Sequence, residues 1–272
     1  MNLLAGRAVR RALHPFVPEE IGAGFSLSST LETGALPIIW AADEPREALD
    51  AYVQMYLKEE IQSEAATRNL PGFARFLPIA GRFHGQRLNV STLARDAGVA
   101  RTTVQGYLEI LEDTLFTFQV PAFEARLRVR ERKHPKLYWT DPGLVRAVVG
   151  DRGVPDAESI GTLLEGWLAQ LLRAYRDYKG ICDDFSYWAP AESRDTEVDF
   201  LLRRGRERVA IEVKASRRWK PEFTKGLRAI ADLEGVSRRI VVYLGTEKLR
   251  PEKGIEALPL AAFLAELERG RI

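Results

Sequence analysis

The sequence predicts an α/β protein, with helices in its N-terminal part and a sheet flanked by helices in its C-terminal part. Three observations favour this class. Residues 44–64 carry apolar side chains at helical spacing, and residues 89–114 read as two short helices joined by a glycine turn. Beyond residue 157 the order becomes helix, three strands, helix, strand, helix, and the continuous apolar run 240–244 is typical of a buried strand.

The composition is that of a folded protein and excludes several classes of site. The chain has 272 residues, 46% hydrophobic and 29% charged, with 40 Lys plus Arg against 38 Asp plus Glu. Cys182 is the only cysteine, which excludes an internal disulfide framework and a cysteine-based zinc site. His14, His84 and His134 lack metal-ligand spacing, so we expect them at surface or capping positions.

The sequence shows neither a membrane-targeting pattern nor a phosphate-binding loop. No run approaches the roughly 18 apolar residues of a membrane span, and the N-terminus is a poor signal peptide. A cytoplasmic protein with no membrane partner is therefore expected. The phosphate-binding pattern G-x-x-x-x-G-K-[ST] does not occur, so we expect no ATP binding or hydrolysis by this chain.

The N-terminal segments read as short elements followed by amphipathic helices. In residues 44–64 the apolar positions recur at helical spacing and favour a helix that docks on its neighbours. A second helix is expected over residues 68–85, with Pro71 in its first turn and glycines at its end.

Residues 89–114 are more specific and favour a helix-turn-helix. Ser91 is the expected N-cap of a helix through Ala97, Gly98 supplies the turn, and a second helix runs from Arg101 to about Glu112. The candidate DNA-contacting residues of the second helix are its polar positions Arg101, Thr102, Thr103 and Gln105.

A basic stretch between two strand-like runs extends this module. The runs are residues 115–123 and 136–141, and an extended chain between them would present one apolar and one cationic face. The candidate DNA-binding arginines of the cationic face are Arg126, Arg128 and Arg130, followed by Arg132. A winged helix would place its wing here. DNA contact and a purely structural or dimerisation role both remain open, because the motif fixes a shape and not a ligand.

A glycine- and acid-rich linker at residues 148–161 separates the C-terminal domain, with a boundary near Ala157. In that domain we expect helices at 161–179, 221–235 and 259–270, and strands at 185–190, 198–204, 208–215 and 239–245.

Two of these strands carry the residues that suggest chemistry. Asp199 lies on one, and Glu212 and Lys214 share one face of the next. A turn at residues 204–206 would fold the strands antiparallel and bring Asp199 opposite the Glu212–Lys214 end. Two carboxylates and an ammonium are suited to hold Mg²⁺ on a phosphodiester and to compensate its charge.

This pattern resembles the PD-(D/E)XK nuclease superfamily. Asp199, twelve intervening residues and then Glu212-Val213-Lys214 follow a helix that carries Glu165. The resemblance implies a restriction-endonuclease-like α/β domain with Asp199 and Glu212 as metal ligands, Lys214 as the catalytic lysine and Glu165 as an auxiliary carboxylate. No proline precedes Asp199, which departs from the superfamily pattern. Glu197, on the same strand face as Asp199, is a spare acid.

A wider resemblance covers nearly the whole chain. Segments such as "LLAGRAVRRALHPFVPEEIG", "RNLPGFARFL" and "KLYWTDPGLVRAVVG" resemble the C-terminal half of prokaryotic AAA-type ATPases that bear a C-terminal domain of unknown function. This implies a lid-like helical edge of an ATPase module at 1–65, a winged helix-turn-helix at 66–150 and a nuclease-like domain at 157–272. The expected partners are DNA and an ATPase module or further copies of the chain.

Two functions follow from these expectations. The first is a DNA-binding protein with a Mg²⁺-dependent endonuclease site. The second is a non-catalytic regulatory or assembly module of an ATPase whose ATP-binding core is not in this chain. A satisfied cluster of two carboxylates and one lysine would serve the second equally well.

Overall fold

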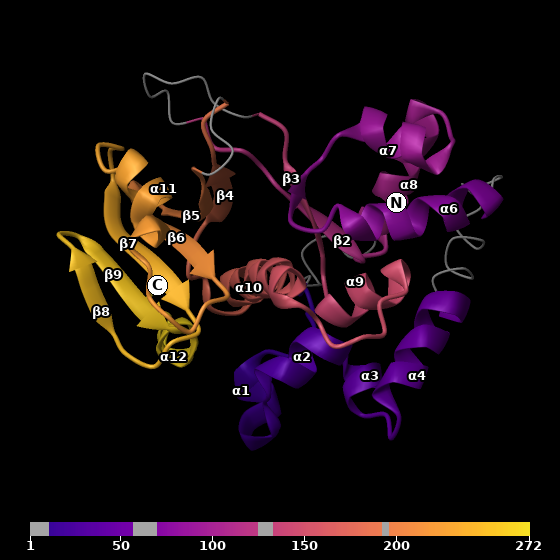
Figure 1. The fold of residues 1–272 in the computed structure, drawn as a ribbon, viewed down its shortest axis with the longest axis horizontal. Coiled ribbons are helices and arrows are strands. Elements are labelled where there is room, and N and C mark those ends of the chain that lie inside the picture. Colours follow the sequence, from indigo (N-terminus) through magenta and orange to yellow (C-terminus); the bar gives the residue numbers. More distant parts are fainter. Residues whose placement is uncertain (1–10, 57–69, 125–132, 192–195) are drawn as a thin grey trace, which may run out of the picture.

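A computed structural model describes residues 11–56, 70–124, 133–191 and 196–272, and its class is mixed α/β (Figure 1). The N-terminal part consists of short helices: α1 (Pro18–Ile21), η1 (Gly22–Gly24), α2 (Leu27–Thr33), α3 (Pro37–Trp40), α4 (Pro45–Ala51) and the π-helical turn η2 (Tyr52–Tyr56). The helix expected over 44–64 includes α4 and η2, and its residues from 57 onward lie outside the described ranges.

Three helices and a small sheet follow. They are α6 (Leu70–Arg82), β1 (Gln86–Arg87), α7 (Val90–Ala97), α8 (Arg101–Asp113), β2 (Thr117–Val120) and β3 (Lys136–Trp139). The strand order is β1-β3-β2, and both pairs are antiparallel. The turn at Gly98 is as expected, with a φ of 63° that favours glycine.

The expected cap of α7 is wrong by two residues. Asn89, with extended backbone, accepts a hydrogen bond from the Thr92 backbone N–H at 3.1 Å, so Asn89 and not Ser91 is the N-cap. Ser91 lies inside the first turn of α7, where its hydroxyl cannot serve as the cap.

Two further helices connect the parts. The first, α9 (Pro142–Val149), was not among the expected helices, and the buried Asp141 is its N-cap. The long helix α10 (Ala157–Lys179) starts at the expected boundary, with Asp156 as its N-cap.

The C-terminal part is a six-stranded sheet in the order β4-β5-β6-β7-β9-β8. Its elements are β4 (Asp184–Trp188), β5 (Val198–Arg204), β6 (Glu207–Lys214), η3 (Pro221–Thr224), α11 (Lys225–Ala229), β7 (Val236–Tyr243), β8 (Leu249–Glu252), β9 (Ile255–Pro259) and α12 (Leu260–Glu268). The β6·β7 and β7·β9 pairs are parallel, and the other pairs are antiparallel. The expected helix over 221–235 is reduced to η3 and α11.

A shared core joins the two parts. One cluster of buried apolar residues runs from Val17 to Ile272 and includes the face of the sheet that α10 covers, while a second cluster fills the opposite face under α11 (Figure 1). The chain after β2 also lies along β4, because the Phe123 N–H donates to the Tyr187 carbonyl at 2.7 Å and the Tyr187 N–H to the Pro121 carbonyl at 3.0 Å. The base of the expected wing therefore packs on the C-terminal sheet. In the described part of the chain, no helix has both the length and the apolar character to span a membrane.

Candidate functional site

The β5/β6 hairpin places the first candidate residues. The strands are antiparallel, with Phe200 opposite Ile211, and they turn at Gly205 as expected. Asp199 therefore reaches the Glu212 end of β6, where its Oδ2 accepts a hydrogen bond from the Val213 N–H at 2.7 Å. The geometry brings together the two carboxylates that the sequence pairs across thirteen positions.

Alternation along β6 sets the direction of its polar side chains. Ile211 and Val213 belong to the core cluster that contains α10, so Glu212 and Lys214 point the other way. Glu212 is buried, and its Oε1 lies 2.5 Å from the Lys214 Nζ. The other oxygen, Oε2, is buried and has no hydrogen-bond partner among the described residues. A buried carboxylate oxygen without a donor is suited to bind a cation.

Asp199 also belongs to a compact group of three acidic side chains, which we call the carboxylate group. Its other members are Glu165 of α10 and Glu197, which lies directly before β5. One oxygen from each lies within 4.8 Å of the others, close enough to surround a single cation. Gly226 at the start of α11 permits this position of Glu197, because a Cβ there would overlap the Glu197 carbonyl oxygen. The expected spare acid thus lies beside Asp199.

A lysine from the N-terminal part occupies this group. The Lys136 Nζ lies 2.8 Å from Glu165 Oε1, 3.1 Å from Glu197 Oε1 and 3.8 Å from Asp199 Oδ1, and its side chain is only 3% exposed. Tyr138, two residues along β3, donates its hydroxyl to the same Glu165 oxygen at 2.6 Å. Sequence reasoning missed both residues, although a Lys and a Tyr at alternate positions of a buried strand are a usable signal.

The crowding of charges shifts their pKa values. Burial, together with Glu212 and Glu165, raises the pKa of Asp199 well above its usual value. Burial likewise raises the pKa of Glu212 to about 7, against the opposing effect of Lys214. For Lys136, burial works to lower the pKa, yet the surrounding anions raise it well above its usual value and keep the ammonium charged.

The candidate DNA-contacting residues lie far along the chain from this cluster. Arg101, Thr102 and Gln105 are exposed at the start of α8, and Thr103 is half-buried. Arg126, Arg128, Arg130 and Arg132 lie outside the described residues.

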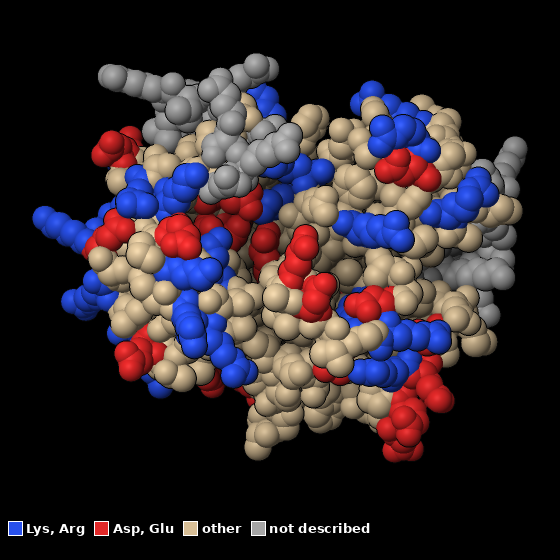
Figure 2. Space-filling view, in the orientation of Figure 1, with Lys and Arg blue, Asp and Glu red and all other residues tan. Residues whose placement is uncertain are grey.

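Basic side chains surround the β5/β6 hairpin, and one of them is neutralised by acids. Arg203 forms ion pairs with Asp183 at 3.2 Å and Asp184 at 2.5 Å, while Arg204, Arg206 and Arg217 are exposed. In the space-filling view acidic side chains gather in the hollow between the two halves, with basic side chains around it (Figure 2). The basic side chains therefore offer cations beside an acidic centre.

The expectation for the histidines is wrong for His84, which is buried. Its Nδ1 accepts a hydrogen bond from the Trp139 N–H at 3.0 Å. Gly166 permits this contact, because a Cβ there would overlap the His84 ring. His84 therefore packs β3 closely onto α10, next to Glu165.

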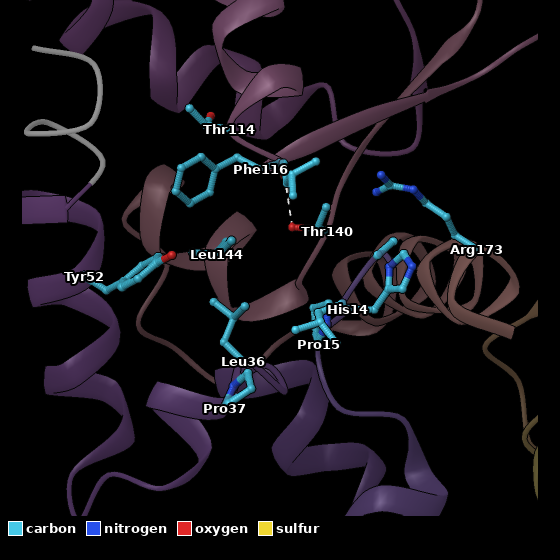
Figure 3. A pocket seen from close by; sticks show the side chains of 13 residues that line it. His14, Pro15, Leu36, Pro37, Tyr52, Thr114, Phe116, Thr140, Leu144 and Arg173 are labelled. Carbon is cyan, nitrogen blue, oxygen red and sulfur yellow. Dashed lines mark hydrogen bonds between the residues drawn. The ribbon is translucent and has the colours of Figure 1, made fainter. Parts of the chain in front are cut away.

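A separate pocket of about 260 Å³ lies between the N-terminal helices and α10 (Figure 3). Its walls are mainly apolar and include Tyr52, Phe116 and Leu144. The two basic groups at its edge are engaged, because Arg173 stacks on Phe118 and His14 contacts Asp177 at 2.8 Å. The carboxylate group is therefore the stronger candidate site.

The fold and this site define a two-part α/β protein whose halves meet at a buried cluster of acids and lysines. Two domain families match the chain. Residues 25–154 match a domain of unknown function, DUF8612, and residues 160–263 match another, DUF4143, which is found at the C-terminal side of AAA-ATPase-associated proteins.

Curated relatives extend the match to most of the chain. The uncharacterized proteins Rv2008c of Mycobacterium tuberculosis and Mb2031c of Mycobacterium bovis are each 26% identical over 262 residues, which is 94% of this chain. The chain spans 57% of the length of these relatives. A crystal structure of the Vibrio cholerae protein VC1899 aligns with 84% of this chain and 55% of its own, at 17% identity and a TM-score of 0.29. That similarity is too low to support an argument.

Proposed function

We propose that this chain is a DNA-binding protein with a Mg²⁺-dependent phosphodiesterase site in its C-terminal domain. The observation that carries the proposal is the meeting of Asp199, Glu212 and Lys214 at one end of the β5/β6 hairpin, with Glu165 approaching from α10. The αβββαβ order around this hairpin supports a PD-(D/E)XK nuclease-like domain.

The donor set fits a hard divalent cation. Asp199 and Glu212 would hold Mg²⁺, since carboxylate oxygens are its preferred protein ligands, and the unpartnered Glu212 Oε2 is an available one. When bound, the ion polarises a phosphate oxygen and lowers the pKa of its water. Lys214 is half-buried beside Glu212 and would offset the charge that develops on the phosphate. Glu165, which approaches from α10, would serve as the auxiliary carboxylate.

The N-terminal module supplies DNA affinity in this proposal. The element order α6-β1-α7-α8-β2-β3, with a sheet in the order β1-β3-β2, supports a winged helix-turn-helix with α8 as the recognition helix. Arg101 and Gln105 are exposed on that helix and are suited to phosphates and base edges.

A second function has one observation in its favour. Lys136 already provides a cation for the carboxylate group, which suits a non-catalytic module that assembles with an ATPase. The match to DUF4143, a domain found in AAA-ATPase-associated proteins, supports an ATPase partner.

Plasmid cleavage separates the two functions. We expect the wild-type chain to nick supercoiled plasmid with Mg²⁺ or Mn²⁺, and Asp199→Asn and Lys214→Ala to lose this activity because each removes a group that acts on the phosphate. Asp184→Asn, on the exposed edge of β4, is the control and should retain it. Absence of cleavage, or equal cleavage by wild type, Asp199→Asn and Lys214→Ala, would end the nuclease proposal.

DNA binding is tested separately from cleavage. Arg101→Glu should weaken binding to duplex DNA about tenfold at low salt, because it places an anion against the phosphates. Arg95→Glu, on the other helix of the motif, is the matched charge change and should weaken it less. Equal affinities for the two variants would exclude α8 as the recognition helix.

A further inference from the structure

The position of Lys136 within the carboxylate group suggests a role for the junction between the two halves. We propose that Lys136 is a tethered cation in a divalent-metal position formed by Glu165, Glu197 and Asp199, so that metal enters only when the lysine is withdrawn. The inference rests on the proposed function for its consequence, because it makes the N-terminal part a gate on the nuclease-like site.

The size of the carboxylate group supports a metal position. Mg²⁺ and Mn²⁺ bind oxygen at about 2.1 Å, so two ligands on opposite sides of an ion are about 4.2 Å apart. One oxygen from each carboxylate lies within 4.8 Å of the others, and the Lys136 Nζ donates hydrogen bonds to Glu165 and to Glu197. An ion and this ammonium cannot share that space.

The charge of the surroundings points to a divalent ion rather than to lysine alone. The carboxylate group and Glu212 are four acids, whereas two ammonium groups among the described residues, Lys136 and Lys214, form ion pairs with them. The buried Glu212 Oε2 has no hydrogen-bond donor among the described residues. Replacing the Lys136 ammonium by a divalent ion would reduce this excess of acids over cations.

Access to the group is available from solvent. The side chains of Glu165 and Glu197 are 19% and 28% exposed, whereas those of Lys136 and Asp199 are 3% and 4% exposed. Ions therefore reach the outer carboxylates while Lys136 fills the inner position.

The backbone of Lys136 is held within the small sheet. The lysine side chain can therefore leave the carboxylate group only if the side chain turns away or the small sheet moves. Lys136 pairs with Arg87 of β1 on one side and with Val120 of β2 on the other. Its Nζ also lies 5.3 Å from the centre of the Tyr187 ring on β4. Release of the ammonium is thereby linked to the contact between the small sheet and the C-terminal sheet.

Mn²⁺ binding, measured by electron paramagnetic resonance, tests the inference without DNA. We expect Lys136→Met to bind one Mn²⁺ about tenfold or more tightly than the wild type, because a competing charge leaves the position. Lys214→Met removes the same charge but leaves Lys136 in the carboxylate group, so its Mn²⁺ affinity should increase less. Lys136→Met with Glu197→Gln should lose the gain, since Glu197 belongs to this position and not to the Asp199–Glu212 pair.

The outcomes are distinguishable. Equal Mn²⁺ affinity for wild type and Lys136→Met, an equal gain in Lys214→Met, or a gain that survives Glu197→Gln would overturn the inference and leave the proposed function standing. A gain in Lys136→Met with no cleavage by any variant would support the inference and reject the nuclease function. Folding is checked by circular dichroism. Lys136→Gln, which retains a donor for Glu165, is the second neutral variant and should also bind Mn²⁺ more tightly than the wild type.

Discussion

Two buried acidic sites in this protein stabilise negative charge by different means. Asp141 accepts hydrogen bonds from the backbone N–H groups of Ala35 at 2.6 Å, Gly143 at 2.8 Å and Leu144 at 3.2 Å. The carboxylate group is held by the Lys136 ammonium. The backbone N–H groups around Asp141 are removed only if α9 or the segment after α2 unfolds. An ammonium, in contrast, can be replaced by another cation. Both sites are buried, and what differs between them is the type of donor that holds the carboxylates.

The largest effect is expected from Lys136→Met without divalent ions. It should lower the free energy of unfolding by about 3–5 kcal/mol, because it leaves buried carboxylates without their cation. Mn²⁺ at about 100 times its dissociation constant should restore about 2.7 kcal/mol. Urea unfolding with and without Mn²⁺ measures both changes, and a loss that Mn²⁺ leaves untouched would mean that the site is purely structural.

The Asp141 cap should respond in the opposite way to metal. Asp141→Ala should lower the free energy of unfolding by about 3 kcal/mol, since three buried N–H groups lose their acceptor. We expect no recovery with Mn²⁺ in the same urea experiment. Recovery equal to that of Lys136→Met would remove the distinction between the two sites.

The close approach of the two halves at Glu165 provides a smaller effect. Gly166→Ala should lower the free energy of unfolding by about 2 kcal/mol, because the new methyl group overlaps the buried His84 ring. Gly161→Ala, in the same helix, meets nothing within 4 Å and should raise stability by up to about 1 kcal/mol. Thermal unfolding of the two variants compares them, and changes of the same sign would contradict the packing argument.

The remaining expected effect is a pH dependence. Burial raises the pKa of Asp141 to about 6 in the folded state from an ordinary value of 3.8. Because the folded state binds this proton more tightly than the unfolded state, protonation of Asp141 contributes to the free energy of unfolding. This contribution is fully present below pH 3.8 and is lost as the pH rises through 6. The free energy of unfolding should therefore fall by about 1.4 kcal/mol per pH unit in that window, relative to Asp141→Asn. Parallel urea-unfolding profiles for wild type and Asp141→Asn would show that Asp141 is already ionised there.

Much of the fold follows from local sequence signals. The β5/β6 hairpin matches its prediction because Gly205 marks the turn and the apolar runs on both sides are long. The strands β8 and β9 were missed because they are short, each contains a proline and the turn at Gly254 lies between them. The pairing of β9 with β7 and of β8 with β9 is not indicated by either short segment alone.

The candidate site was predictable only where its residues share a hairpin or a helix pattern. Asp199 and Glu212 meet because the hairpin register sets their spacing. The resemblance places Glu165 beside them, and strand alternation places Glu197 on the same face as Asp199. Lys136 could not be placed there, because its position depends on the packing of β3 against α10 through His84 and Gly166. Lys136 and Glu165 are 29 positions apart, and nothing in the intervening sequence indicates that they approach one another.

The most direct test of the account is the location of Mn²⁺ in crystals of wild type and Lys136→Met grown with the ion. The account predicts an anomalous-difference peak among Glu165, Glu197 and Asp199 in the variant and none at that position in the wild type. A peak there in both crystals, or none there in the variant, would contradict the claim that Lys136 occupies a metal position.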